Sequence, residues 1–382
     1  MTTTLQIGPP DAPPPPPRHR APRRRRGRWI VAICVALLIW PSISYAQALT
    51  YPGAADFTTR TVEWIRDNGG APIVNFIENL WYSRAPSAAP PDPSSLPSAG
   101  AAATAPAAPP ALAPLAGTPP LPGEGVWVAG TPAPNGAPAV YTTFERPDPA
   151  HPGVVAGVAY FDQRLARFQL IAGTAEPPGA SMPEGARVPP SELQALVATF
   201  NSGFKMKDAN GGWFGNGQTV VPLQNGAASL VIHRDGTATV AQWGRDATAG
   251  PNVVAVRQNL QLIVDGGHAV PGLTVNAGGA WGSAKNQLQY TWRSGLGVTA
   301  NGNIVYVGGA NMNLAALADA LTKAGAVRGM QLDIHDKMVD AFTYQHAGTG
   351  APTPQKLLPD MPGTNDRYLV ADQRDFVAVT LR

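Results

Sequence analysis

Apolar side chains recur at helical spacing in one segment near the C-terminus. Within residues 313–323 they fall at i, i+3, i+4 and i+7, at Leu314, Leu317, Ala318 and Leu321. This spacing places them on one face and predicts a helix. Gly325 follows at the position where helices commonly end, because glycine enters the left-handed conformation without steric cost.

The pattern changes to strict alternation after this helix. From Met330 to His335, apolar residues alternate with Gln331, Asp333 and His335, which predicts a strand with its polar side chains on one side. Asp333 and His335 would then lie roughly 6.5–7 Å apart along the strand. Ligands often collect at strand ends in such units. The alternative is an ordinary solvated strand end.

Elsewhere in residues 124–382 the hydrophobic pattern predicts mostly strands. They are expected at residues 125–129, 154–161, 168–171, 228–233, 238–243, 260–264, 304–307 and 376–381. Clear helices are expected at residues 190–200 and 313–323. We therefore predict an α+β fold with a mixed or antiparallel sheet core and a few helices.

The chain begins with segments of a different composition. Residues 1–28 are rich in proline and arginine and are predicted to be a disordered cytoplasmic tail. Residues 29–48 carry no charge and are predicted to be a transmembrane anchor or a secretory signal cleaved after Ala48. The preceding arginines favour an extracytoplasmic C-terminal domain. We expect a single-pass protein of the cell membrane, or a secreted one if the segment is cleaved.

Two further segments precede residues 124–382. Residues 49–84 have the apolar spacing of two short amphipathic helices, interrupted at Gly69-Gly70. Trp64, Trp81 and Tyr82 suit a membrane interface, and packing against the neighbouring domain is an equal alternative. Residues 85–123 are alanine, proline and serine with a single charge, Asp92, and are predicted to be a disordered linker.

Charge and cysteine content exclude several classes of protein. Residues 18–28 hold seven arginines, and without these and Asp11 the remaining chain has 21 basic and 24 acidic residues. A nucleic-acid surface would need a basic face on the folded part, so no nucleic acid is expected as a partner. Cys34 is the only cysteine, which excludes a disulfide. Without a paired-histidine or nucleotide motif, we expect no metal and no cofactor.

Three glycine-containing motifs carry the remaining candidate chemistry. In residues 199–207, Asn201, Gly203, Phe204 and Lys205 form a turn whose backbone N–H groups and lysine can bind an anion. A plain hairpin loop is the alternative.

The other two motifs are an arginine strand and an Asp-Gly turn. Arg293 begins a strand beside Gly295 and Gly297, where it can bind a phosphate in bidentate fashion, with a structural ion pair as the alternative. An Asn301-Gly302 hairpin follows it. Asp265-Gly266 predicts a turn, with Asp265 as a further substrate-binding candidate.

In this order, these motifs resemble the phosphodiester glycosidase family. The resemblance covers roughly residues 190–345 and depends on segments 200–204, 262–266, 293–302, 311–314 and 332–333. One departure is clear, because the family usually has glycines and a serine after the Leu-Asp step, where this chain has Ile334-His335.

The resemblance implies an extracytoplasmic, membrane-anchored hydrolase that cleaves the glycosidic bond of a sugar-1-phosphate diester. For this reaction our hypothesis is that Asp333 acts as base or nucleophile at the sugar and that Arg293 binds the phosphate. His335 is a candidate proton carrier, because its pKa is expected near working pH. The expected partners are a phosphorylated glycan or cell-wall polymer and, through the N-terminal helix, the membrane. The alternative is a non-catalytic module that binds a phosphodiester-linked envelope polymer.

Overall fold

The computed structural model describes residues 23–53, 55–98, 100, 102–103, 108–275, 279–282, 286–346 and 350–382. Within α1 (Arg23–Thr50), the side chains of residues 23–28, 30–32 and 34–38 also lie outside the description. The chain divides into two compact units, Met1–Thr50 and Tyr51–Arg382.

The first unit contains the long helix α1, which includes Pro41. Its start corrects the predicted boundary of the tail: residues 23–28 are helical, since arginine has a high helix propensity and the last preceding proline is Pro22. The rest of the predicted tail lies outside the described residues. Among the helices in the described part of the chain, none has the length and apolarity needed to span a bilayer.

The second unit begins with two short helices, α2 (Phe57–Ile65) and α3 (Ala71–Tyr82), joined by the π-helical turn η1 (Arg66–Gly70). Asp56 caps α2 by accepting a hydrogen bond from the Thr59 N–H at 2.8 Å. Gly69 has a φ of 91°, which interrupts the helical path at the expected place.

The predicted disordered linker is wrong for much of its described part, which packs on the domain. After the short helix η2 (Pro93–Ser95), the side chains of Leu112 and Leu115 are buried. The N–H of Leu112 donates to the carbonyl of Gly125 at 3.0 Å. The indole N–H of Trp127 donates to the carbonyl of Pro110 at 2.8 Å. Proline-rich backbone still offers carbonyl acceptors, and the two leucines add apolar contact.

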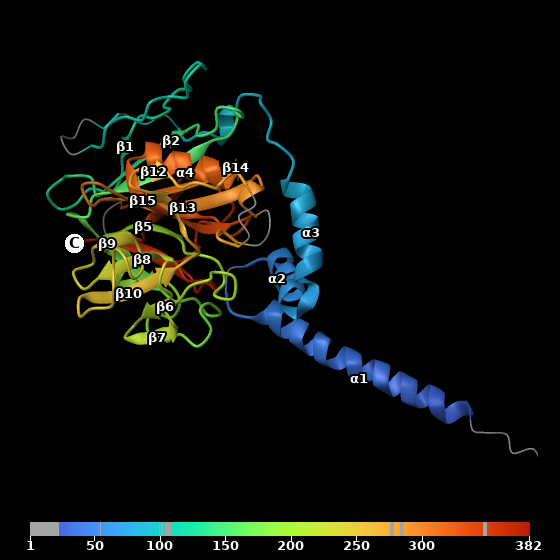
Figure 1. Cartoon of the computed structure of the whole chain (residues 1–382). Coiled ribbons are helices and arrows are strands. Elements are labelled where there is room, and N and C mark those ends of the chain that lie inside the picture. Colours follow the sequence, from blue (N-terminus) through green and yellow to red (C-terminus); the bar gives the residue numbers. More distant parts are fainter. Residues whose placement is uncertain are drawn as a thin grey trace, which may run out of the picture. The chain divides into compact units, whose positions relative to one another are not determined.

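Three antiparallel sheets form the domain, as predicted for an α+β fold (Figure 1). The eight-stranded sheet runs in the order β1 (Val128–Ala129), β2 (Val140–Glu145), β3 (Ala156–Phe161), β14 (Ile304–Met312), β13 (Thr291–Thr299), β15 (Ala326–Ile334), β11 (Leu262–Asp265) and β12 (His268–Ala269). One five-stranded sheet runs β7 (Gln218–Val221), β6 (Trp213–Gly215), β10 (Val253–Gln258), β8 (Ala228–His233) and β9 (Ala238–Gln242). The other runs β17 (Thr353–Lys356), β16 (Ala341–Gln345), β5 (Leu196–Asn201), β18 (Phe376–Leu381) and β4 (Ala166–Ile171).

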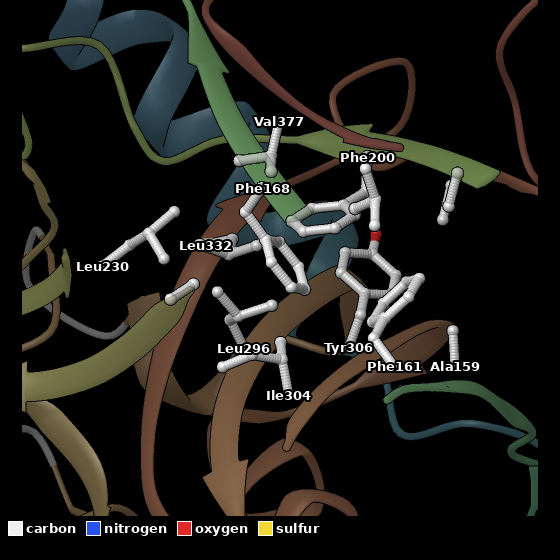
Figure 2. Close-up of a cluster of buried hydrophobic side chains, with 14 of the residues drawn as sticks. Ala159, Phe161, Phe168, Phe200, Leu230, Leu296, Ile304, Tyr306, Leu332 and Val377 are labelled. Carbon is white, nitrogen blue, oxygen red and sulfur yellow. The ribbon is translucent and has the colours of Figure 1, made fainter. Parts of the chain in front are cut away.

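All three sheets contribute to one core. Figure 2 shows Phe161 and Leu296 of the large sheet, Leu230 of the β7–β9 sheet, and Phe168 and Phe200 of the β17–β4 sheet converging on one another. The opposite face of the large sheet is covered by α4 (Leu314–Lys323), whose apolar stripe is buried as predicted. Asn313 caps α4, and Gly325 after it has a φ of 92°.

The helix predicted at residues 190–200 is wrong beyond its first turn. Residues Pro190–Ala195 form the 3₁₀ helix η3, and the chain then enters β5. Every residue of β5 is buried, between β16 and β18. A strand buried on both faces loses its alternation, so its apolar run can be mistaken for a helix.

A register shift in β15 changes which side chains share a face. Arg293 of β13 is opposite Ile334, and Gly295 is opposite Gln331, so two steps on β13 span three on β15. Such a bulge turns the following residues to the other face. Leu332 therefore belongs to the core of Figure 2, whereas Ile334 packs in the core under α4.

Candidate functional site

The candidate site forms where β15 ends beside the residues that precede β18. Asp333 is buried, and its Oδ2 accepts a hydrogen bond from Nη2 of Arg374 at 2.6 Å. Its Oδ1 accepts one from the N–H of Ile334 at 2.9 Å. The bulge and the last loop thus bring a carboxylate and a guanidinium together in the interior.

Arg374 also binds the glycine-containing loop after β5. Its Nη2 donates to the carbonyl of Gly203 at 2.9 Å. A Cβ at Gly203 would lie 2.9 Å from the Asn259 side chain, so the loop approaches closely only with glycine there. In the part of the chain that the structure describes, Nε of Arg374 and Oγ of Ser202 are buried without a hydrogen-bond partner. Unsatisfied buried donors of this kind suit an anionic ligand.

A second buried carboxyl group and a second ion pair adjoin Arg374. Glu176 is buried and accepts a hydrogen bond at Oε2 from the N–H of Met206 at 3.0 Å. Arg257 donates through Nε to Oδ2 of Asp375 at 2.7 Å, with both side chains almost fully buried. We call Asp333, Glu176, Arg374, Asp375 and Arg257 the Arg374 cluster.

The carboxyl groups of this cluster have shifted proton affinities. Burial raises the pKa of Asp333 to about 6, against the lowering effect of the Arg374 guanidinium. Burial likewise raises the pKa of Glu176, with Arg374 again opposing. Asp333 is therefore ionised at neutral pH and takes up a proton under mildly acidic conditions, as a general base requires.

Acidic residues of the α2–η1 segment cover the cations of the site. Oε1 of Glu63 lies 3.6 Å from Nη1 of Arg374 and 3.5 Å from Nζ of Lys205. Asp67 binds Lys205 through Oδ2 at 3.1 Å and Lys207 through Oδ1. Two carboxylates of this segment thus neutralise the cations of the site.

A cavity of about 220 Å³ adjoins Arg374. Its charged lining residues are Lys337, Arg367, Arg374, Asp56 and Asp372. Asp333 is not among the described residues on the cavity wall, but its hydrogen-bond partner Arg374 is. The excess of cations on the wall favours anionic ligands.

The structure does not bring Arg293, expected on the phosphate, together with Asp333, expected at the sugar. Arg293 is fully buried and donates to the carbonyl of Met312 at 2.9 Å, to Oε1 of Gln331 at 2.7 Å and to the carbonyl of Gln289 at 3.1 Å. Burial lowers its pKa to about 9. Arg293 lies opposite Ile334 on the α4 side of the bulge, which turns it away from the Arg374 cluster.

His335 lies beyond the end of β15, so the expected strand alternation with Asp333 does not hold. It has a φ of 77°. Its ring stacks on Tyr82 with centroids 5.1 Å apart, and Nε2 lies 3.6 Å from Oε2 of Glu78. Burial lowers its pKa to about 3, which corrects the expectation of a proton carrier near neutral pH.

The other predicted residues have structural contacts in the interior or lie at the surface. Nδ2 of Asn201 donates to Oγ of Ser294 at 2.9 Å, and that hydroxyl donates to the Asp333 carbonyl at 3.0 Å, so Asn201 holds β15 in place. Phe204 is a core residue. Asp265 is the last residue of β11, beside the turn to β12, and pairs with Arg245 at 2.7 Å, which corrects its assignment to the substrate site. The Gly203 carbonyl contacts Arg374 and Lys205 contacts Glu63, and their role in substrate binding stays a prediction.

Sequence reasoning missed Arg374 and Glu176. Arg374 belongs to the segment Asp372-Gln373-Arg374-Asp375, just before the last strand. Such a charged segment suggests an exposed turn, so Arg374 was not considered as a site residue. Glu176 precedes Pro177 in a loop. The sequence signal that could have indicated Arg374 is the high density of charge directly before an apolar strand. Among the described residues, no group of three His, Cys, Asp or Glu is placed to hold a metal ion.

Comparisons with known proteins show a distant resemblance in fold. No family model matches the chain, and no curated protein matches it. The chain is similar to the zebrafish N-acetylglucosamine-1-phosphodiester α-N-acetylglucosaminidase catalytic domain, auto-inhibited by its pro-peptide, with a TM-score of 0.42 and 15% identity over 67% of this chain and 87% of that one.

Two further solved structures are less similar. One is a hypothetical protein from Synechocystis, with a TM-score of 0.36 and 14% identity over 65% of this chain and 63% of that one. The other is a putative exported protein from Burkholderia pseudomallei, with a TM-score of 0.31 and 12% identity over 60% and 74%.

Proposed function

We propose that residues 124–382 form an extracytoplasmic hydrolase that cleaves the glycosidic bond of a sugar-1-phosphate diester in a phosphorylated glycan or cell-wall polymer. Residues 29–48 hold it at the cell membrane. The observation that carries this proposal is the buried Asp333 carboxylate, with a pKa of about 6, bound to a guanidinium beside a glycine loop. The order of the sequence motifs supports the same reaction.

Each group of the site has a role in this reaction. Arg374 and Lys205 bind the phosphate, and the buried donors of Arg374 and Ser202 add hydrogen bonds to its oxygens. Asp333 acts at the anomeric carbon as base or nucleophile, and Glu176 is the second carboxyl group that glycoside hydrolysis ordinarily uses. The bond from the anomeric carbon to the phosphate oxygen breaks, and water supplies the new hydroxyl group.

Substrate binding requires the α2–η1 acids to give way. Glu63 and Asp67 neutralise the same cations that the phosphate needs. A phosphate therefore replaces their carboxylates rather than joining them. Because phosphate is a good leaving group, positioning and charge neutralisation matter more than protonation of the leaving oxygen.

The test is release of reducing sugar and phosphomonoester from sugar-1-phosphate diesters by the full chain in detergent. We expect Asp333→Asn and Glu176→Gln each to lower kcat by about 10²-fold or more. Val275→Ala, an exposed apolar position, serves as control. Full activity in both carboxyl variants would refute the assignment.

Glu63 and Asp67 form ion pairs with the cations of the site. This pairing favours one alternative function, a module that binds an envelope polymer without cutting it. Binding of the polymer by the wild-type chain, with no release of reducing sugar at any pH between 5 and 8, would support that alternative.

A further inference from the structure

Helix α3 presents its apolar face outward. Five large side chains of this helix are 57% to 69% exposed: Ile73, Phe76, Ile77, Leu80 and Trp81. They fall at i, i+3, i+4, i+7 and i+8, which places them on a single stripe. We call them the α3 stripe. Scattered apolar residues on a surface need no explanation, but a continuous stripe of this kind marks an interaction site.

The polar face of the same helix holds it on the domain. Oδ1 of Asn79 accepts a hydrogen bond from Nε2 of Gln289 at 2.6 Å. The carbonyl of Tyr82 accepts one from the N–H of Tyr290 at 2.8 Å, while its ring stacks on His335. A surface helix normally buries its apolar stripe and exposes its polar face. In α3 the arrangement is reversed, so the core cannot be the partner of the stripe.

The charges around the stripe favour a lipid surface as its partner. No acidic residue belongs to the stripe, and the guanidinium of Arg84 lies 5.7 Å from the centre of the Trp81 ring at its end. Tryptophan and arginine together suit the headgroup region, where the ring is half immersed and the cation meets anionic phosphates.

The preceding chain supplies a second argument for lipid. Residues 29–55 carry no charge, and seven arginines stand at residues 18–28. This composition is typical of a segment that enters a bilayer. The uncharged segment ends at residue 55, just before Asp56, and 17 residues separate it from the start of the stripe at Ile73. We propose that the α3 stripe lies in the interface of an anionic lipid bilayer, with the domain held on the aqueous side by the polar face of α3.

The first experiment places an environment-sensitive fluorophore on the stripe. In full-length chain carrying Cys34→Ser, a single cysteine is introduced as Ile77→Cys or, as matched control, as Val275→Cys, which is also exposed. Both are labelled and reconstituted in phosphatidylcholine/phosphatidylglycerol vesicles. We expect a blue-shifted emission and quenching by nitroxide lipids at position 77, and neither at position 275. Because both variants share residues 29–48, the difference reports α3 alone.

The second experiment separates the stripe from the N-terminal segment. A protease site is inserted after Thr50, and the chain is cut once it is folded and bound to vesicles. We expect the released 51–382 part to stay on the vesicles, and Phe76→Ser/Ile77→Ser/Leu80→Ser to lower its partition by roughly tenfold or more. Retained circular dichroism shows that the variant is folded.

Three outcomes would overturn the proposal. In the first, the label at position 77 stays as aqueous as the label at position 275. In the second, the triple serine variant remains on vesicles as well as the wild type. In the third, the label is already in an apolar environment without vesicles and sedimentation shows a dimer, which would mean that the stripe binds protein.

Discussion

Replacing Asp333 by asparagine should stabilise the fold while lowering kcat of the proposed hydrolysis by about 10²-fold or more. Burial raises the pKa of Asp333 from 3.8 to about 6, so the folded state binds this proton more tightly than the unfolded state does. The stabilisation that the protonated Asp333 carboxyl provides is fully present below pH 3.8 and is lost as the pH rises through about 6. The shift of about 2 pH units corresponds to about 3 kcal/mol at neutral pH. An isosteric neutral amide avoids that cost, so Asp333→Asn should gain up to about 3 kcal/mol in unfolding free energy at pH 7.5.

The assay is denaturant unfolding of both proteins at pH 7.5 and pH 4, together with sugar release at pH 7.5. The stability difference should shrink toward zero at pH 4, where both side chains are neutral. Asp340→Asn is a matched control, because burial also raises the pKa of Asp340 to about 6, and its partners are Arg367 and the Gly363 N–H. As one member of a structural ion pair with Arg367, Asp340 should cost stability at pH 7.5 when it is replaced, and activity should be kept.

The opposite result has a definite meaning. Removing one member of a structural buried ion pair costs about 3–5 kcal/mol, because the other charge is left buried and unpaired. If Asp333→Asn loses stability by that amount at pH 7.5, Asp333 and Arg374 form an ordinary structural pair. A gain in stability with loss of activity is the pattern of a functional group held at a cost to the fold.

Three further predictions follow from the same contacts. Arg374→Met removes the cation that lowers the pKa of Asp333, and it should move the acidic limb of kcat/KM upward by about one pH unit or more, with no shift counting against the pair. Burial lowers the pKa of His335 from 6.5 to about 3, so its contribution is full above pH 6.5 and falls as the solution is acidified. Between pH 6.5 and 4.5, His335→Asn should lose about 2 kcal/mol less unfolding free energy than the wild type, and equal losses would contradict the shift. Glu63→Gln/Asp67→Asn should raise the affinity for inorganic phosphate about tenfold in calorimetry, and an unchanged affinity would show that the acids do not compete with it.

Periodicity alone predicted the elements whose burial is one-sided. The stripe of α4 and the Asn301-Gly302 and Asp265-Gly266 turns were predicted from local rules, because apolar spacing and positive φ at glycine are local properties. β5 was not predicted correctly, because a strand buried on both faces has no alternation to read.

The site depends on features that are not local. The β15 bulge is produced by pairing with β13, and it separates Arg293 from the face predicted for it. Arg374 reaches Asp333 only because β18 inserts between β4 and β5, which carries the residues before it to the loop after β5. A strand order of this kind cannot be derived from the spacing of residues along one chain. Gly203 and Lys205 were found because they share a local motif.

The charge balance of the site favours a singly charged anion, such as the proposed phosphodiester, over a doubly charged one. The domain contributes four cations and three carboxyl groups around Gly203, which are Arg374, Arg257, Lys205 and Lys207 against Asp333, Glu176 and Asp375. One positive charge is then left over when all three acids are ionised. Glu63 and Asp67 of the α2–η1 segment reverse this excess to one negative charge. A phosphodiester carries a single negative charge, so it neutralises the domain's excess when these two acids are displaced, whereas a phosphomonoester with nearly two charges would leave an unpaired anion beside the buried carboxylate of Asp333. This difference in charge predicts that the product phosphomonoester leaves the site more readily than the substrate.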